Sequence, residues 1–196
     1  MDTEELLKGI ECGARARFMT VMQRDSLDEL TKLVREARPK TILELGTAVG
    51  YSGIAMLSAY CGARLYTVEY LEERAEEAKH NFEKAGFKDR VTQFVDSADT
   101  VLTHLSGEFD FMFVDAAKAH YGEYFAWLDK HLARHGTMVF DNVLFRGYVK
   151  GGKTYRHRMN TIVTKLREFI KQVENDSSYN CRLLDVGDGL LIAEKK

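Results

Sequence analysis

Hydrophobic and polar positions along this chain form two patterns that alternate, and these predict strands and helices in succession. Short, almost continuous apolar runs such as 109–114 have the length and composition of buried parallel strands. Elsewhere apolar residues recur every three to four positions, as at Leu27, Leu30 and Leu33, which is typical of one buried helix face. The predicted helices are 26–37, 53–63, 72–85, 100–105, 121–133 and 156–173, and the predicted strands are 42–45, 65–68, 91–95, 109–114, 137–140, 181–186 and 190–193.

Five strand–helix units followed by a terminal hairpin predict the α/β class. We expect a doubly wound, mostly parallel sheet with a C-terminal antiparallel hairpin, which places one antiparallel strand near its edge. No linker or repeat divides the chain, so we expect one domain over 1–196, with an N-terminal helical segment at 1–38 and a Rossmann-like core at 39–196. In such a sheet, ligands bind at the carboxyl ends of the strands. Four acids follow or end predicted strands on that side: Glu44, Glu69, Asp115 and Asp141.

Composition narrows the class of protein only a little. A chain of 196 residues, 45% hydrophobic and 30% charged, can bury a core without disulfides or metal. Its three cysteines (Cys12, Cys61 and Cys181) are far apart and odd in number, as expected of reduced thiols. The sequence has no membrane-length apolar run and no signal-peptide pattern. We therefore expect a cytoplasmic protein with no membrane partner.

The first strand runs into a glycine-bearing turn, Glu44-Leu-Gly-Thr-Ala-Val-Gly-Tyr-Ser52. Gly46 and Gly50 let the backbone turn tightly and approach a ligand, and the helix that follows offers free N–H groups. The next strand ends at Glu69, a carboxylate placed to hold a ribose diol. These features predict a nucleoside cofactor; the alternative is an ordinary strand-to-helix turn.

The spacing of the glycines distinguishes two classes of cofactor. A dinucleotide site has G-x-G-x-x-G, whereas this chain has Glu44-x-Gly46-x-x-x-Gly50. A carboxylate beside the loop would repel a pyrophosphate but suits a ligand that carries an ammonium and a sulfonium. The segment resembles the class I methyltransferases, which bind S-adenosylmethionine (SAM), and it disfavours a nicotinamide dehydrogenase.

Two further strands end in polar residues that indicate a metal site. Asp115 follows one strand, and Asp141 and Asn142 follow the next, so three hard oxygen ligands lie at neighbouring strand ends. Mg²⁺ accepts such ligands and keeps positions for water or substrate. Alternatively, Asp141 and Asn142 only cap the following loop. A divalent ion here would lower the pKa of a phenol-like hydroxyl and fix its orientation.

Lys118 lies one turn beyond Asp115 and can take a proton or stabilise an oxyanion. The alternative is a solvated surface lysine, and we assign no role to His120. Transfer of a methyl group from sulfonium to oxygen is an in-line displacement, so alignment supplies most of the rate gain.

Four segments together resemble the metal-dependent O-methyltransferases, the family of catechol O-methyltransferase and the caffeoyl-CoA enzymes: 44–52, 114–118, 141–144 and 186–190. The likeness runs from about Val21 to the C-terminus. It implies the class I methyltransferase fold, a homodimer, and Mg²⁺ or Mn²⁺ held by Asp115, Asp141 and Asn142. It also implies that Lys118, with Asp115, acts in catalysis.

The resemblance also implies contacts to SAM. Ser52 and Glu69 contact the cofactor, Met22 lies near its methionine end, and Ser97 and Ala98 line the adenine. The residues expected to bind cofactor, from the motif and the resemblance together, are Met22, Glu44, Gly46, Thr47, Gly50, Ser52, Glu69, Ser97, Ala98 and Asp115. Asp96 stands where the family usually has a glycine.

Within the family, the chain is most similar to the bacterial branch that methylates 5-hydroxyuridine at the tRNA wobble position, giving 5-methoxyuridine. From Arg146 to Arg167 the chain carries basic residues and no acid, with Tyr148 and Tyr155 among them. A basic stripe suits a phosphate backbone, and aromatic rings can stack on splayed anticodon bases. The residues expected to bind RNA are Arg146, Lys150, Lys153, Arg156 and Arg158. The alternative is an ordinary solvated helix face.

Other substrates and a different class of protein stay open. A catechol, like 5-hydroxyuracil, presents a hydroxyl beside a second oxygen, so both can chelate one metal ion. A small-molecule enzyme should cover its pocket with an apolar lid, but this N-terminus is short for the family and carries Arg15, Arg17 and Arg24. That favours the tRNA anticodon region over a small phenol. The third possibility is an RNA-binding protein without turnover.

Overall fold

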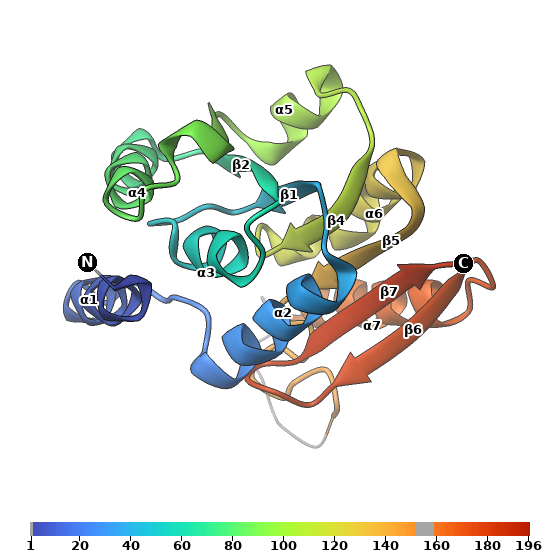
Figure 1. Ribbon diagram of the computed structural model, residues 1–196. Helices are drawn as coiled ribbons and strands as arrows, with labels where there is room; N and C mark the ends of the chain where they lie inside the picture. Colours follow the sequence, from blue (N-terminus) through green and yellow to red (C-terminus); the bar gives the residue numbers. More distant parts are fainter. Residues whose placement is uncertain (1, 152–158) are drawn as a thin grey trace.

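Within the described residues, seven strands form one sheet in the order β3-β2-β1-β4-β5-β7-β6. Figure 1 shows how the sheet lies among the helices. The computed structural model describes residues 2–151 and 159–196. The strands are β1 Thr41–Leu45, β2 Arg64–Glu69, β3 Val91–Val95, β4 Phe109–Val114, β5 Leu132–Phe140, β6 Tyr179–Leu184 and β7 Leu190–Lys195. The first five strands pair in parallel, and β7 is antiparallel to both of its neighbours, β5 and β6. The predicted fold class, with one antiparallel strand next to the edge, is confirmed.

Helices cover both faces of the sheet, with α2 and α3 in front of it and α6 and α7 behind it in Figure 1. Their bounds are α1 Thr3–Ala16, α2 Arg24–Ala37, α3 Tyr51–Ala59, α4 Glu72–Lys84, α5 Ala98–His104, α6 Tyr121–His131 and α7 Asn160–Glu174, with short 3-10 turns at Lys88–Arg90 (η1) and Lys118–His120 (η2). Successive strand residues point to opposite faces, so Ile42 packs in the core under α1 to α4 and Leu43 in the core under α5 to α7.

Element boundaries differ from the predictions where backbone geometry intervenes. Helix α3 begins at Tyr51, two residues before its predicted start, because Gly50 takes a φ of +83° and caps the helix directly. Strand β5 begins at Leu132, inside the predicted helix 121–133, so α6 ends earlier than expected. The start predicted for the last helix, residue 156, lies outside the described residues.

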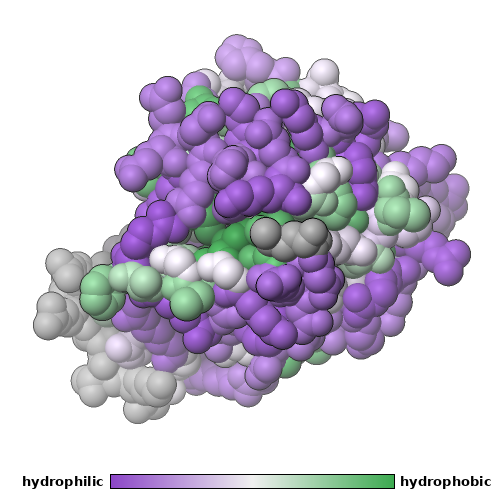
Figure 2. Space-filling model, turned by 60° about the vertical axis from the view of Figure 1, so that its left-hand side comes forward, coloured by the Kyte–Doolittle hydropathy of each residue, from purple (hydrophilic) through white to green (hydrophobic). Residues whose placement is uncertain are grey.

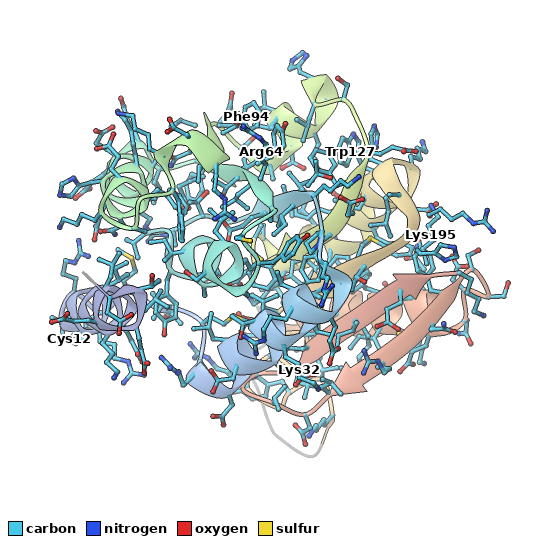
Figure 3. All side chains as sticks on the ribbon, viewed as in Figure 1. Cys12, Lys32, Arg64, Phe94, Trp127 and Lys195 are labelled. Carbon is cyan, nitrogen blue, oxygen red and sulfur yellow. The ribbon has the colours of Figure 1, made fainter. Side chains whose placement is uncertain are left out.

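The N-terminal segment is held against the rest of the molecule. Helix α1 buries Leu6, Leu7 and Ile10, and the Arg17 guanidinium donates to both carboxylate oxygens of Glu77 on α4 at 2.7 and 2.6 Å. The three cysteines form no disulfide, and Figure 3 places Cys12 on the outer side of α1. Among the described helices, none is long and apolar enough to span a bilayer.

Candidate active site

A cavity of ≈ 1050 Å³ opens where the parallel strands end. Most of its lining residues come from the α1–α2 connection, from the segments that follow β1, β2, β3, β4 and β5, and from the turn between β6 and β7. Figure 2 shows a face that is hydrophilic over most of its area, with apolar side chains gathered in a hollow near the middle. The position of the cavity is the one expected for a ligand site in a doubly wound sheet.

The turn between β1 and α3 depends on Gly46. Its φ is +103°, and a Cβ at this position would lie 2.3 Å from the backbone oxygen of Asp115. The ends of β1 and β4 therefore approach each other more closely than any residue with a side chain would allow. Gly46 lines the cavity, as expected for a residue beside a ligand.

Glu44 lies behind this turn instead of facing the cavity. It is fully buried, and its two oxygens accept hydrogen bonds from the hydroxyls of Ser52 and Thr67, each at 2.6 Å. Burial raises the pKa of Glu44 to about 7. Thr47 is also buried and shares a hydrogen bond with Thr67.

Part of the expected cofactor site lies outside the cavity lining. The lining includes neither Glu44, Thr47 and Ser52 nor Gly50. The Glu44 carboxylate lies behind the turn, between the hydroxyls of Ser52 and Thr67. Contact between these four residues and a cofactor stays a prediction.

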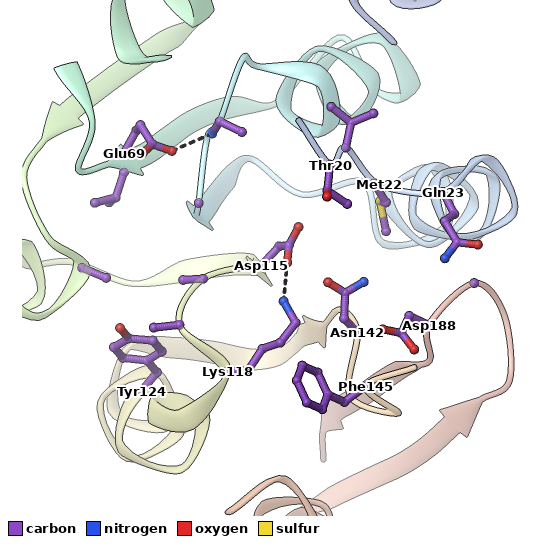
Figure 4. A pocket seen from close by; sticks show the side chains of 18 of the residues that line it. Thr20, Met22, Gln23, Glu69, Asp115, Lys118, Tyr124, Asn142, Phe145 and Asp188 are labelled. Carbon is purple, nitrogen blue, oxygen red and sulfur yellow. Dashed lines mark hydrogen bonds and ion pairs between the residues drawn. The ribbon is translucent and has the colours of Figure 1, made fainter. Parts of the chain in front are cut away.

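Glu69, the last residue of β2, does line the cavity and is held in a fixed orientation (Figure 4). Its two oxygens accept the backbone N–H groups of Ala48 at 2.8 Å and Leu71 at 3.0 Å. Each carboxylate oxygen retains capacity for another donor, such as a ribose hydroxyl. Ser97 and Ala98, at the start of α5, and Met22, from the α1–α2 connection, complete this part of the wall.

Asp115 and Lys118 form an ion pair on the cavity wall. The Lys118 Nζ atom lies 3.2 Å from Asp115 Oδ1, and both side chains are partly exposed. Figure 4 shows the Asp115 carboxylate and the Asn142 amide at the same part of the cavity, with the lysine reaching up from below. The structure thus brings together three of the four residues predicted for metal binding and catalysis at the cavity surface.

Asp141 lies just beneath this surface and is fully buried. Its Oδ1 accepts the N–H of Asn142 at 2.6 Å, whereas Oδ2 has no hydrogen-bond partner among the described residues. Burial and the nearby charge of Asp115 raise the pKa of Asp141 to about 7. A buried carboxylate oxygen without a partner needs an explanation, and beside Asp115 and Asn142 it fits a ligand of a divalent cation.

Basic residues near the cavity lie beside acidic side chains and backbone carbonyl groups. Arg146 and Lys150 line the cavity; Lys150 forms an ion pair with Asp185, and the backbone N–H of Arg146 donates to Asp188. Arg167, counted in the predicted basic stripe, instead donates to the carbonyls of Val149 at 2.9 Å and Tyr148 at 3.0 Å, so its role is structural. Lys153, Arg156 and Arg158 lie outside the described residues.

The sequence did not reveal some residues that build the site. Tyr121 hydrogen-bonds to the backbone at the ends of β4 and β5, and Phe145 and Asp188 line the cavity. Asp188 lies in the motif segment 186–190, but nothing in the sequence assigned these residues to the site, because their positions depend on packing between elements. His120, given no role from the sequence, lies 2.8 Å from Glu123 and belongs with Asp99 to a group of possible metal ligands within 4.8 Å of one another.

The fold is that of O-methyltransferases solved with SAM or S-adenosylhomocysteine (SAH). TomG from Streptomyces achromogenes, solved in complex with SAM, is 28% identical with a TM-score of 0.86, covering 98% of this chain and 90% of TomG. An O-methyltransferase from Bacillus cereus, solved with SAH, is 26% identical with a TM-score of 0.84, covering 98% of this chain and 91% of that one.

The family model described as O-methyltransferase matches residues 4–196, and the chain belongs to this family. Catechol O-methyltransferase from Niastella koreensis is 40% identical over 126 residues, covering 61% of this chain and 57% of the relative. Catechol O-methyltransferase from Mycobacterium tuberculosis is 36% identical over 120 residues, covering 60% of this chain and 54% of the relative. The chain spans just over half the length of these curated relatives.

Proposed function

We propose that this protein transfers a methyl group from SAM to a hydroxyl oxygen with the help of a divalent cation. One observation carries the proposal: a buried carboxylate oxygen of Asp141 has no partner among the described residues, and Asp141 lies just beneath the cavity wall that Asp115 and Asn142 line. The family and the relatives solved with SAM or SAH support SAM as the methyl donor.

Each part of the cavity has a task in this reaction. Glu69, fixed by two backbone N–H groups, would accept the ribose hydroxyls, and Met22 would pack against the methionine end of the cofactor. Asp115, Asp141 and Asn142 would hold Mg²⁺ or Mn²⁺, which lowers the pKa of an acceptor hydroxyl and fixes its orientation. Lys118, paired with Asp115, would take the proton or stabilise the oxyanion.

For the substrate we propose 5-hydroxyuridine at the wobble position of tRNA. Arg146 and Lys150 lie at the cavity, and further basic residues follow them in the sequence. Such a group can bind the phosphates of an anticodon loop. Phe145 lines the cavity and offers a ring against which a flat base can stack.

The second candidate is a small catechol-like phenol. The curated relatives named above are catechol O-methyltransferases, and a catechol presents the same pair of neighbouring oxygens as 5-hydroxyuracil. The ion pair between Lys150 and Asp185 also removes part of the positive charge that a tRNA would need. Both candidates use the same catalytic groups. They differ in the groups that would contact the rest of the substrate beyond its reacting hydroxyl.

The two substrates are distinguished by methyl transfer from labelled SAM, with Mg²⁺ present, to tRNA containing 5-hydroxyuridine and separately to a simple catechol. Methylation of the tRNA that is lost on adding EDTA is the expected result. Methylation of the catechol alone would keep the mechanism and assign the protein to small phenols. Methylation of neither acceptor would contradict both assignments.

A further inference from the structure

Tyr121 connects the two strand ends that carry the carboxylates of the site. It is the first residue of α6 and fully buried, and its hydroxyl lies 2.9 Å from the carbonyl oxygen of Asp141 and 3.3 Å from that of Val114. A tyrosine hydroxyl has one proton, so it donates chiefly to Asp141, with Val114 as the weaker acceptor. Val114 immediately precedes Asp115, so this hydroxyl reaches the backbone beside both carboxylates.

Residue 141 is fixed from two sides. The carbonyl of Asp141 accepts the Tyr121 hydroxyl, and Oδ1 of its side chain accepts the N–H of Asn142, whose φ of +55° turns the chain sharply. A buried carbonyl without a donor is destabilising, so the backbone would shift if the hydroxyl were absent. With both contacts in place, Oδ2 is the atom of this carboxylate left for a further ligand.

The ring of Tyr121 is itself held tightly. It packs in the core under α5 to α7, with ring centroids 5.5 Å from Phe140 and 5.8 Å from Phe169. The turn η2, which begins at Lys118, leads directly into Tyr121. Anchoring this one residue therefore fixes the C-terminal end of the turn that carries Lys118, as well as the strand ends.

We propose that Tyr121 is a positioning residue for the divalent-cation site, holding the backbone beside Asp115 and Asp141 so that both carboxylates can reach one cation. This inference rests on the proposed function, because it assumes a cation at these carboxylates. Groups that orient metal ligands without touching the metal commonly change metal affinity by 10–100-fold when they are removed. Tyr121 is not among the residues that line the cavity, so removing its hydroxyl takes away no direct contact to substrate or cofactor.

The test is the affinity for Mn²⁺, measured by calorimetry in the presence of S-adenosylhomocysteine. In Tyr121→Phe we expect Mn²⁺ affinity about tenfold weaker than in the wild type, with the affinity for S-adenosylhomocysteine unchanged. The matched control is Tyr179→Phe, which removes the hydroxyl of another tyrosine of the same core, where it donates to Asp129 in a partly buried hydrogen bond. The control should lose thermal stability but keep wild-type Mn²⁺ affinity.

Wild-type Mn²⁺ affinity in Tyr121→Phe would overturn the inference and leave the proposed function standing. Equal loss in both variants would also overturn it, because it would indicate general loosening of this core. A wild-type protein that binds S-adenosylhomocysteine but no Mn²⁺ would overturn the inference together with the metal-dependent function. Retained binding of S-adenosylhomocysteine shows in each case that the variant is folded.

Discussion

Glu44 and Asp141 are both buried carboxylates with a raised pKa, but the partners of their oxygens differ. Hydroxyl groups of Ser52 and Thr67 occupy both oxygens of Glu44, so this residue joins β1, β2 and α3. Asp141 keeps one oxygen without a partner in the described part of the chain. At the scale of single residues, we therefore expect the first carboxylate to stabilise the fold and the second to bind a ligand.

Replacing Glu44 by Gln should make the protein less sensitive to pH. Folding raises the pKa of Glu44 from an ordinary 4.5 to about 7, so between these values the folded state binds a proton that the unfolded state has lost. Stability from this group therefore falls as the pH rises through that window. We compare the unfolding free energies of Glu44→Gln and the wild type, measured by urea denaturation without cofactor. From pH 4.5 to pH 8 this difference should shift by about 2–3 kcal/mol in favour of the variant. The prediction would be contradicted if the difference in unfolding free energy between Glu44→Gln and the wild type were constant with pH.

Lys118→Ala should lower kcat by about a hundredfold or more, the usual contribution of a positioned proton-transfer group. The affinity for S-adenosylhomocysteine should stay the same, because Lys118 itself is not among the residues expected to bind the cofactor. Lys118→Arg then separates the two possible roles, since arginine keeps the charge but cannot act as a base at neutral pH. Activity retained in Lys118→Arg would assign oxyanion stabilisation, and activity lost in both would favour the base. Full activity in Lys118→Ala would exclude either role.

At the scale of elements, the close approach of two strand ends shapes the site. Gly46 places the end of β1 against the backbone of Asp115, and Gly50 is the N-cap of α3 at the end of the same short turn. The cavity wall is therefore backbone at this point, as a ligand lying across the strand ends requires.

Gly46→Ala should destabilise the protein by more than the backbone strain alone. A Cβ at Gly46 would lie 2.3 Å from the Asp115 oxygen, whereas at Gly86, which has a similar positive φ of +75°, it would meet nothing within 4 Å. Gly86→Ala should cost about 1 kcal/mol from strain, and Gly46→Ala at least about 2 kcal/mol more. Urea denaturation of both variants tests this, and equal losses would show that the turn can relax.

The sequence predicted the elements well but not the contacts between them. Apolar runs that end in acids identified β1, β2, β4 and β5 and hence the edge where the cavity opens. The direction of the Glu44 side chain was not predictable, because it depends on a register that places Thr67 opposite it. Arg167 looked like surface charge because its carbonyl partners lie 18 and 19 residues away. Tyr121 looked like an ordinary helix start for the same reason.

At the scale of the whole molecule, the charge around the cavity is the property that distinguishes a tRNA substrate from a small phenol. Acids and bases both line it: Asp185 and Asp188 face the same space as Arg146 and Lys150. A positive surface for RNA therefore depends on the basic residues of the segment after Lys150, including Arg156 and Arg158.

Reversing the charge at Arg156 and Arg158 should weaken tRNA binding and reduce its dependence on salt, because fewer phosphates would be neutralised. Methylation of a free catechol should not change. The matched control reverses Lys79 and Lys84, two exposed lysines of α4 that do not line the cavity. Binding measured by filter retention at several salt concentrations distinguishes the pairs. Loss of both activities in the Arg156 and Arg158 variant would mean that this segment is structural.

The central claim is that methyl transfer depends on a divalent cation at Asp115, Asp141 and Asn142. Its most direct test is transfer from labelled SAM to both candidate acceptors, by the wild type with Mg²⁺, the wild type with EDTA, and Asp141→Ala with Mg²⁺. We predict transfer only by the wild type with Mg²⁺, while all three samples bind S-adenosylhomocysteine. Transfer that persists in EDTA and in Asp141→Ala would contradict the claim.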